Sequence, residues 1–134
     1  MATQRNQNQN NQNNNIDPSR IYYIHPSDAS TTQLMSVKFN GDGFHYWKRS
    51  MLLTLSAKNK LGFVDGTIAI PSTTAIDYKY WERCNSLVIS WLLYNLNESI
   101  ANSVLFMQTA KEIWDDLEER FGYASMTQIY SLEQ

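Results

Sequence analysis

Four carboxylates lie within residues 115–119, where a pair of acids could act as general acid and base. They are Asp115, Asp116, Glu118 and Glu119. Helical spacing places them opposite Trp114 and Phe121 on the same segment, so the acids face water while the rings face a core. We therefore interpret this cluster as a solvated helix face rather than as a catalytic pair.

The other residue types that commonly do chemistry are few. The two histidines, His25 and His45, have no neighbour at a spacing typical of metal ligands, and the chain holds no glycine-rich loop ahead of a lysine. The single cysteine, Cys84, excludes an internal disulfide framework and a four-cysteine zinc site. It falls on an apolar helical face, where it is typical of a small buried hydrophobe. We expect no catalytic residue, no metal and no cofactor.

Basic residues gather in the first half of the chain and acidic residues in the second. Residues 38–60 hold five bases and one acid, whereas residues 98–133 hold seven acids and two bases. The candidate contact residues for RNA or for a partner are Lys48, Arg49, Lys58 and Lys60. Three interpretations stay open: neutralisation within the domain for each single residue, association between copies through complementary patches, and an RNA-binding patch.

Overall charge and hydropathy narrow the class of protein. The net charge of −2 lacks the basic excess that is usual for a dedicated nucleic-acid binder. No apolar run approaches the length of about 18 residues that a membrane span needs, and no secretory signal is recognisable. These features indicate a soluble protein of a reducing compartment, and we expect a cytoplasmic location without membrane contact and without a small-molecule substrate.

The chain divides into a tail and one domain, and the domain contains the elements that would position these groups. Eleven of the first 15 residues are Asn or Gln, which predicts a disordered tail over residues 1–19. Residues 20–134 form the expected domain, beginning with an extended arm at Ile21–Ile24. Apolar spacing predicts helices from Phe44 to about Lys60, with Gly62 as terminator, over residues 75–96 behind Thr74 as N-cap, and from Glu98 onward. We expect a tight turn at Asp65–Gly66.

The last part of the chain carries two further helical patterns. Thr109 and Glu112 make a capping box at the start of a helix that ends at Gly122. Another helix is expected from Ser125, and the chain stops inside it, which suggests a fragment of a longer protein. The fold class is therefore mainly α, a compact bundle of about four to five helices with a short extended arm. The expected core residues are Trp47, Met51, Leu55, Trp81, Val88, Trp91, Ile113, Trp114, Leu117 and Phe121.

Several motifs occur in an order that carries a family resemblance. The runs Ile21–Asp28, Phe39–Met51 and Lys58–Gly66 resemble the Copia-like N-terminal domain of retrotransposons. The runs Trp81–Asn85 and Ala110–Phe121 are similar to the start of the Gag polypeptide region of copia-type elements with long terminal repeats. The resemblance assigns residues 20–68 to the first segment and residues 75–134 to the start of the second.

This resemblance implies a structural protein without enzymatic activity, with an all-helical capsid part. Gag polypeptides of such elements assemble with other copies of themselves into virus-like particles around the element's RNA, and they are abundant in plants. The zinc knuckle that often grips RNA in Gag has no counterpart here, because the chain holds one cysteine. Self-association is therefore the first functional hypothesis, and an RNA-binding module that uses the basic first helix is the alternative.

Overall fold

A computed structural model describes residues 20–28 and 34–123 of the chain. The described part is mainly helical, which confirms the predicted fold class. The expected tail at 1–19 and the helix expected from Ser125 lie outside the described residues. The elements are the 3-10 helix η1 (Pro26–Asp28), the α-helices α2 (Phe44–Ala57), α3 (Gly62–Asp65), α4 (Tyr78–Tyr94), α5 (Glu98–Val104) and α6 (Ala110–Leu117), and the π-helix η2 (Glu118–Gly122).

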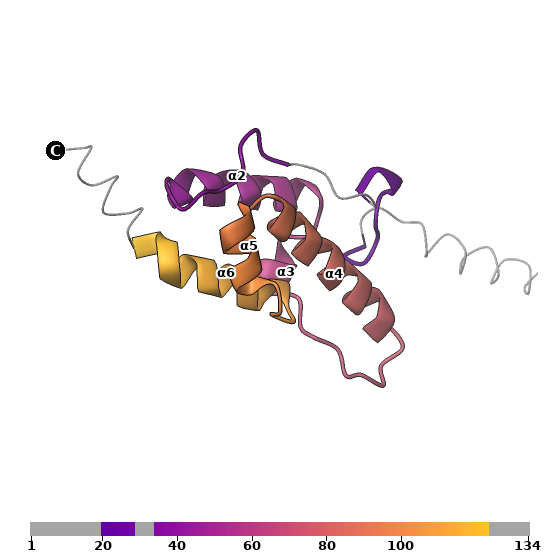
Figure 1. Cartoon of the computed structure of the whole chain (residues 1–134). Helices are drawn as coiled ribbons and strands as arrows, with labels where there is room; N and C mark the ends of the chain where they lie inside the picture. The colour runs from indigo at the N-terminus through magenta and orange to yellow at the C-terminus, as the bar shows by residue number, and fades with distance from the viewer. Residues whose placement is uncertain (1–19, 29–33, 124–134) are drawn as a thin grey trace, which may run out of the picture.

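The helices lie close together (Figure 1) and enclose a single core of aromatic and aliphatic side chains. Helices α3 and α4 both pack against α6, and η2 continues α6 until it reaches α2. The four tryptophans Trp47, Trp81, Trp91 and Trp114 are all buried, and the rings of Trp47 and Trp114 stack with their centroids 5.8 Å apart. Among the other expected core residues, Phe121 is half-buried and the rest are buried: Met51, Leu55, Val88, Ile113 and Leu117.

Helix α2 begins and ends at backbone conformations that α-helical geometry does not allow. Gly43 precedes it with φ 68°, and Asn59 follows it with φ 58°, in the left-handed region that asparagine tolerates better than most residues. The prediction that Gly62 terminates this helix is wrong, because Gly62 begins α3. A Cβ atom on Gly62 would lie 2.4 Å from Cγ1 of Ile68, so close packing rather than left-handed geometry requires glycine there.

The segment after α2 also differs from the prediction. The expected tight turn at Asp65–Gly66 is the end of the one-turn helix α3, and Gly66 closes that helix with φ 81°. Helix α4 is shorter than the predicted 75–96, with Asp77 rather than Thr74 at the N-cap position. The predicted cap at Thr109 is confirmed, since its side chain accepts a hydrogen bond from the Glu112 N–H at 3.1 Å.

An extended segment crosses the end of α4 and completes the core. Phe39 forms an isolated parallel bridge with Leu96, in which the Phe39 N–H donates to the Asn95 carbonyl at 2.9 Å and the Asn97 N–H donates to the Phe39 carbonyl at 2.8 Å. The Phe39 ring is buried, and its centroid lies 5.4 Å from that of the Trp47 ring and 5.0 Å from that of the Phe121 ring. This bridge joins the first part of the chain to the middle of the helical core.

Candidate functional site: the arm groove

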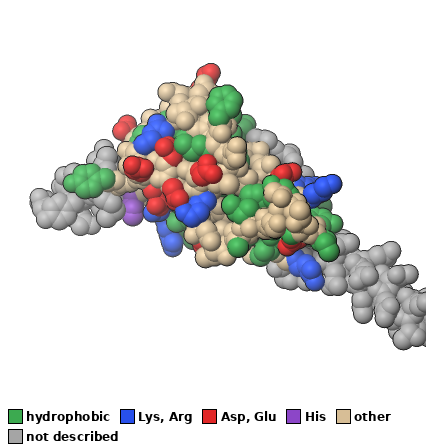
Figure 2. All heavy atoms as spheres, turned by 90° about the horizontal axis from the view of Figure 1, so that it is seen from below, with side chains coloured by type: hydrophobic (Ala, Val, Ile, Leu, Met, Phe, Trp, Pro, Cys, Tyr) green, Lys and Arg blue, Asp and Glu red, His purple; other side chains and the backbone are tan. Residues whose placement is uncertain are grey.

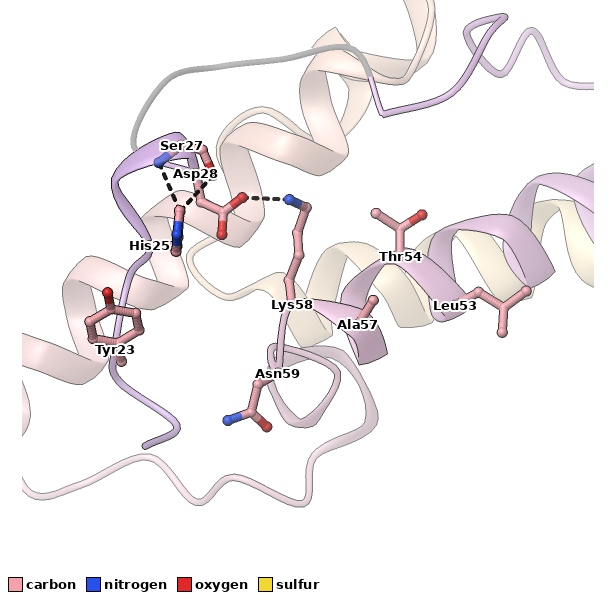
Figure 3. A pocket seen from close by; sticks show the side chains of 9 residues that line it. All are labelled: Tyr23, His25, Ser27, Asp28, Leu53, Thr54, Ala57, Lys58 and Asn59. Atoms are coloured by element: carbon pink, nitrogen blue, oxygen red, sulfur yellow. Dashed lines mark hydrogen bonds and ion pairs between the residues drawn. The ribbon is translucent and has the colours of Figure 1, made fainter. Parts of the chain in front are cut away.

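A hollow on the described surface lies between the N-terminal arm, residues 20–28, and the end of α2. We call this hollow, about 670 Å³ in volume, the arm groove (Figure 3). One wall comes from the arm and η1, and the other comes from α2 and the turn after it. Its lining residues are Tyr23, His25, Ser27, Asp28, Leu53, Thr54, Ala57, Lys58 and Asn59.

Two lysines fix the arm in place. Lys58 forms an ion pair with Asp28 across the groove, and the Lys60 ammonium donates a hydrogen bond to the Tyr23 carbonyl at 2.6 Å. Lys58 also lies over the Trp91 ring, 5.4 Å from its centroid. The sequence marked both lysines as candidate contacts for RNA or for a partner. In the structure, both lysine side chains instead contact the arm and hold it on the helical core.

Burial separates Lys60 from the other basic residues. Its side chain is only 3% exposed, and burial lowers the pKa of its ammonium group because desolvation disfavours the charged form. This burial removes Lys60 from the candidate contact residues. No periodicity signal distinguishes such a lysine from an exposed one, since it lies in the turn between α2 and α3 rather than on a helix face.

A thiol and an aromatic ring hold the other side of the arm. The Cys84 Sγ lies 3.4 Å from the Tyr22 carbonyl oxygen, and the Tyr22 ring lies 6.4 Å from that of Phe63. Cys84 is fully buried, as the sequence indicated, and burial raises the pKa of its thiol despite the opposing charges of Lys60 and Arg83. A raised thiol pKa is the opposite of what a reactive cysteine needs.

The groove holds a serine, a histidine and an aspartate, but their geometry is that of a helix cap. His25 Nδ1 lies 2.7 Å from Ser27 Oγ and accepts the Ser27 N–H at 3.1 Å, so both contacts of this nitrogen lie at the start of η1. Asp28 pairs with Lys58 rather than with the imidazole (Figure 3). The arrangement therefore orients η1, and it does not form the relay of base and carboxylate that activates a serine nucleophile.

The remaining candidate contact residues, Lys48 and Arg49, lie next to each other on α2. Lys48 forms an ion pair with Glu118 of η2, so charge neutralisation within the domain is confirmed for Lys48 as it is for Lys58. Arg49 is exposed and has no ion pair to any residue that the structure describes. Within the described part of the chain, Arg49 is therefore the candidate on α2 that lacks an ion pair.

The acidic cluster of residues 115–119 lies on the surface, as its spacing indicated. Asp115 accepts from Lys111 at 2.6 Å and Asp116 accepts from Arg120 at 3.0 Å, each across one helical turn. Figure 2 shows acidic and basic side chains intermingled on the face seen from below. Within residues 20–28 and 34–123, no group of three or more His, Cys, Asp or Glu side chains could hold a metal ion.

Two buried asparagines, one within α4 and one at its end, hold neighbouring loops and were not found from the sequence. Asn95 is fully buried, accepts the N–H groups of Leu34 and Met35 at 2.9 and 3.1 Å, and donates to the Trp91 carbonyl at 2.7 Å. Asn85 donates to the Gln108 carbonyl at 2.9 Å and accepts the Ala110 N–H at 3.0 Å. Each amide therefore ties a loop to α4.

These features define a helical domain in which the basic residues near the groove serve internal structure. A family model described as Gag-polypeptide of LTR copia-type matches residues 25–72, which run from the arm through α2 and α3. This match confirms the resemblance to copia-type Gag, and all the groove residues except Tyr23 lie inside it. Searches of curated proteins and of solved structures each find no match to the chain.

The matched stretch is about a third of the chain. Among the residues that the structure describes, no helix is both long enough and apolar enough to span a membrane.

Proposed function

We propose that this chain is a Gag-like structural module that acts in the cytoplasm by associating with other copies of itself, as in the shell of a virus-like particle. The match to copia-type Gag over residues 25–72 carries this proposal. The folded domain supports it, because large apolar side chains lie exposed on its surface, among them Ile76 and Phe106.

The ion pairs indicate which force drives this association. Lys48, Lys58, Lys111 and Arg120 are each paired within one copy, so fewer of the segregated charges are left for contacts between copies. Contacts between exposed apolar groups remain, and these are weakly screened by salt, unlike exposed ion pairs. We therefore expect association that persists at high ionic strength.

Multi-angle light scattering of the full chain tests this function. At concentrations from low to high micromolar, in about 50 mM and about 500 mM salt, the mean mass should rise with concentration to a similar extent in both buffers. A strict monomer under all these conditions would overturn the proposal. Association that disappears at the higher salt would overturn the apolar mechanism and favour charged patches.

RNA binding is the second candidate from the sequence, and the structure leaves it little support. Among the four candidate contact residues, Arg49 is exposed without an ion pair to a described residue, whereas Lys48 and Lys58 are paired and Lys60 is buried. A gel shift with unrelated single-stranded RNA separates the two functions. Retarded RNA whose binding falls steeply with salt, and which is lost in Arg49→Glu, would favour RNA binding over association.

A further inference from the structure

A second, smaller hollow lies on the side of the domain where the loop after α3 meets the start of α6. It measures about 230 Å³, and its walls are mostly apolar: Phe63, Ile68, Ala69, Ile70 and Trp81. We call it the α3–α4 pocket. An apolar cavity of about 150 Å³ is large enough to hold benzene, so this pocket has room for the ring of an aromatic side chain.

The polar side chains at this pocket are already engaged, which determines the chemistry of an occupant. The Asn85 amide uses both its oxygen and its nitrogen on the backbone of Gln108 and Ala110. Lys111 is paired with Asp115, and the Thr109 hydroxyl oxygen accepts the Glu112 N–H. A polar ligand would find few free partners here, whereas an apolar ring would bury surface without leaving polar groups unsatisfied.

The chain carries an aromatic side chain of the right kind beside the pocket. Phe106, in the turn between α5 and α6, is 91% exposed, and its neighbour Leu105 is also exposed. Phe106 does not line the pocket of its own copy, although Thr109, three residues later, does. Figure 1 shows the connection from α5 to α6 beside the start of the loop that leaves α3.

We propose that Phe106 of one copy inserts into the α3–α4 pocket of a second copy. Because the inserted ring and the pocket lie on adjoining stretches of chain, two copies related by a two-fold axis exchange their rings reciprocally. A buried aromatic side chain in a desolvated pocket is the usual centre of an interface. The inference rests on the proposed self-association and assigns its contact.

Two variants of the full chain test this contact. Phe106→Ala removes the ring and leaves the pocket intact, whereas Ala69→Phe fills the pocket from an exposed position on its wall and leaves the ring intact. Each should weaken association at least about 30-fold, the scale of an interface hot spot. Tyr46→Ala is the matched control, because it removes another largely exposed aromatic side chain, on α2, and should leave association unchanged.

Mixing the two variants provides the decisive measurement by light scattering and sedimentation. A pair of identical variants lacks both reciprocal contacts, and an equimolar mixture should associate more tightly than either variant alone but less tightly than the wild type, since one intact ring then meets one intact pocket. Unchanged association in Phe106→Ala, or a mixture that associates no more tightly than either variant alone, would overturn the assigned contact and leave the proposed function standing. A wild-type chain that is itself monomeric would overturn the proposed function as well. Unchanged circular dichroism and urea midpoints confirm that both variants fold.

Discussion

The ammonium group of Lys60 lies 2.6 Å from the backbone carbonyl oxygen of Tyr23, inside the domain. The lysine belongs to the turn after α2, and the tyrosine belongs to the N-terminal arm, 37 residues earlier in the chain. A buried ammonium is costly unless it is hydrogen-bonded, so this contact satisfies the lysine and fixes the arm at the same time. The arm is therefore held by chemistry that the surrounding sequence pattern does not reveal.

Replacing Lys60 by methionine should loosen the arm while the helical core stays folded. Met keeps much of the apolar stem but leaves the Tyr23 carbonyl without its donor, at a cost of about 1–3 kcal/mol in the free energy of unfolding. Hydrogen exchange at residues 20–28 should become faster, whereas exchange in α4 should change little. Lys79→Met, at an exposed position on α4, is the control. Exchange at residues 20–28 that is equally fast in both variants would show that the hydrogen bond from Lys60 to Tyr23 does not hold the arm.

Because Cys84 is buried, the stability of the domain depends on pH in the alkaline range. Its thiol pKa is raised above the ordinary value of 9.0, so the folded chain holds this proton at a pH where the unfolded chain has released it. The contribution of the thiol is complete below pH 9 and is lost as pH rises through the folded pKa, with a slope of at most about 1.4 kcal/mol per pH unit.

Urea titrations of the wild type and of Cys84→Ala between pH 7.5 and about 10 measure this effect. The wild type should lose more stability over this range than Cys84→Ala does. Lys60 acts in the opposite direction, because its lowered pKa makes stability rise as pH increases toward 10.5, and both chains contain it. Parallel profiles for the two chains would show that the thiol does not titrate differently on unfolding.

Asn95 should be among the most sensitive polar positions in the domain. Asn95→Ala leaves the N–H groups of Leu34 and Met35 without their acceptor and frees the Trp91 carbonyl from its side-chain donor. Each buried group left unsatisfied costs about 1–3 kcal/mol, so the variant should lose at least about 2 kcal/mol in the free energy of unfolding. Asn102→Ala, at an exposed position, should cost less than about 0.5 kcal/mol in the same urea titration.

Apolar periodicity was sufficient to place α2, α4, α5 and α6 and to bury the tryptophans, because burial of one face repeats every three to four residues; it did not indicate the one-turn helix α3. Periodicity gave no signal where a residue is required by one contact with a neighbour that only the folded chain brings close. Gly62 is required by its approach to Ile68, and Asn95 by the two N–H groups of a segment about 60 residues earlier. Both requirements arise from tertiary neighbours. The arm groove was missed for the same reason, since Asp28 and Lys58 meet only after folding.

The Trp47 ring offers a final test, which separates packing from hydrogen bonding. Its indole nitrogen is buried without a hydrogen-bond partner among the described residues, while its ring stacks on Trp114 and lies near Phe39. Trp47→Phe removes the unsatisfied donor and keeps an aromatic ring, so it should cost less than about 1.5 kcal/mol. Trp47→Ala leaves a cavity and should cost about 3–5 kcal/mol. Urea unfolding gives both values, and equal losses in the two variants would show that the indole nitrogen has a partner or that the ring stacking contributes nothing.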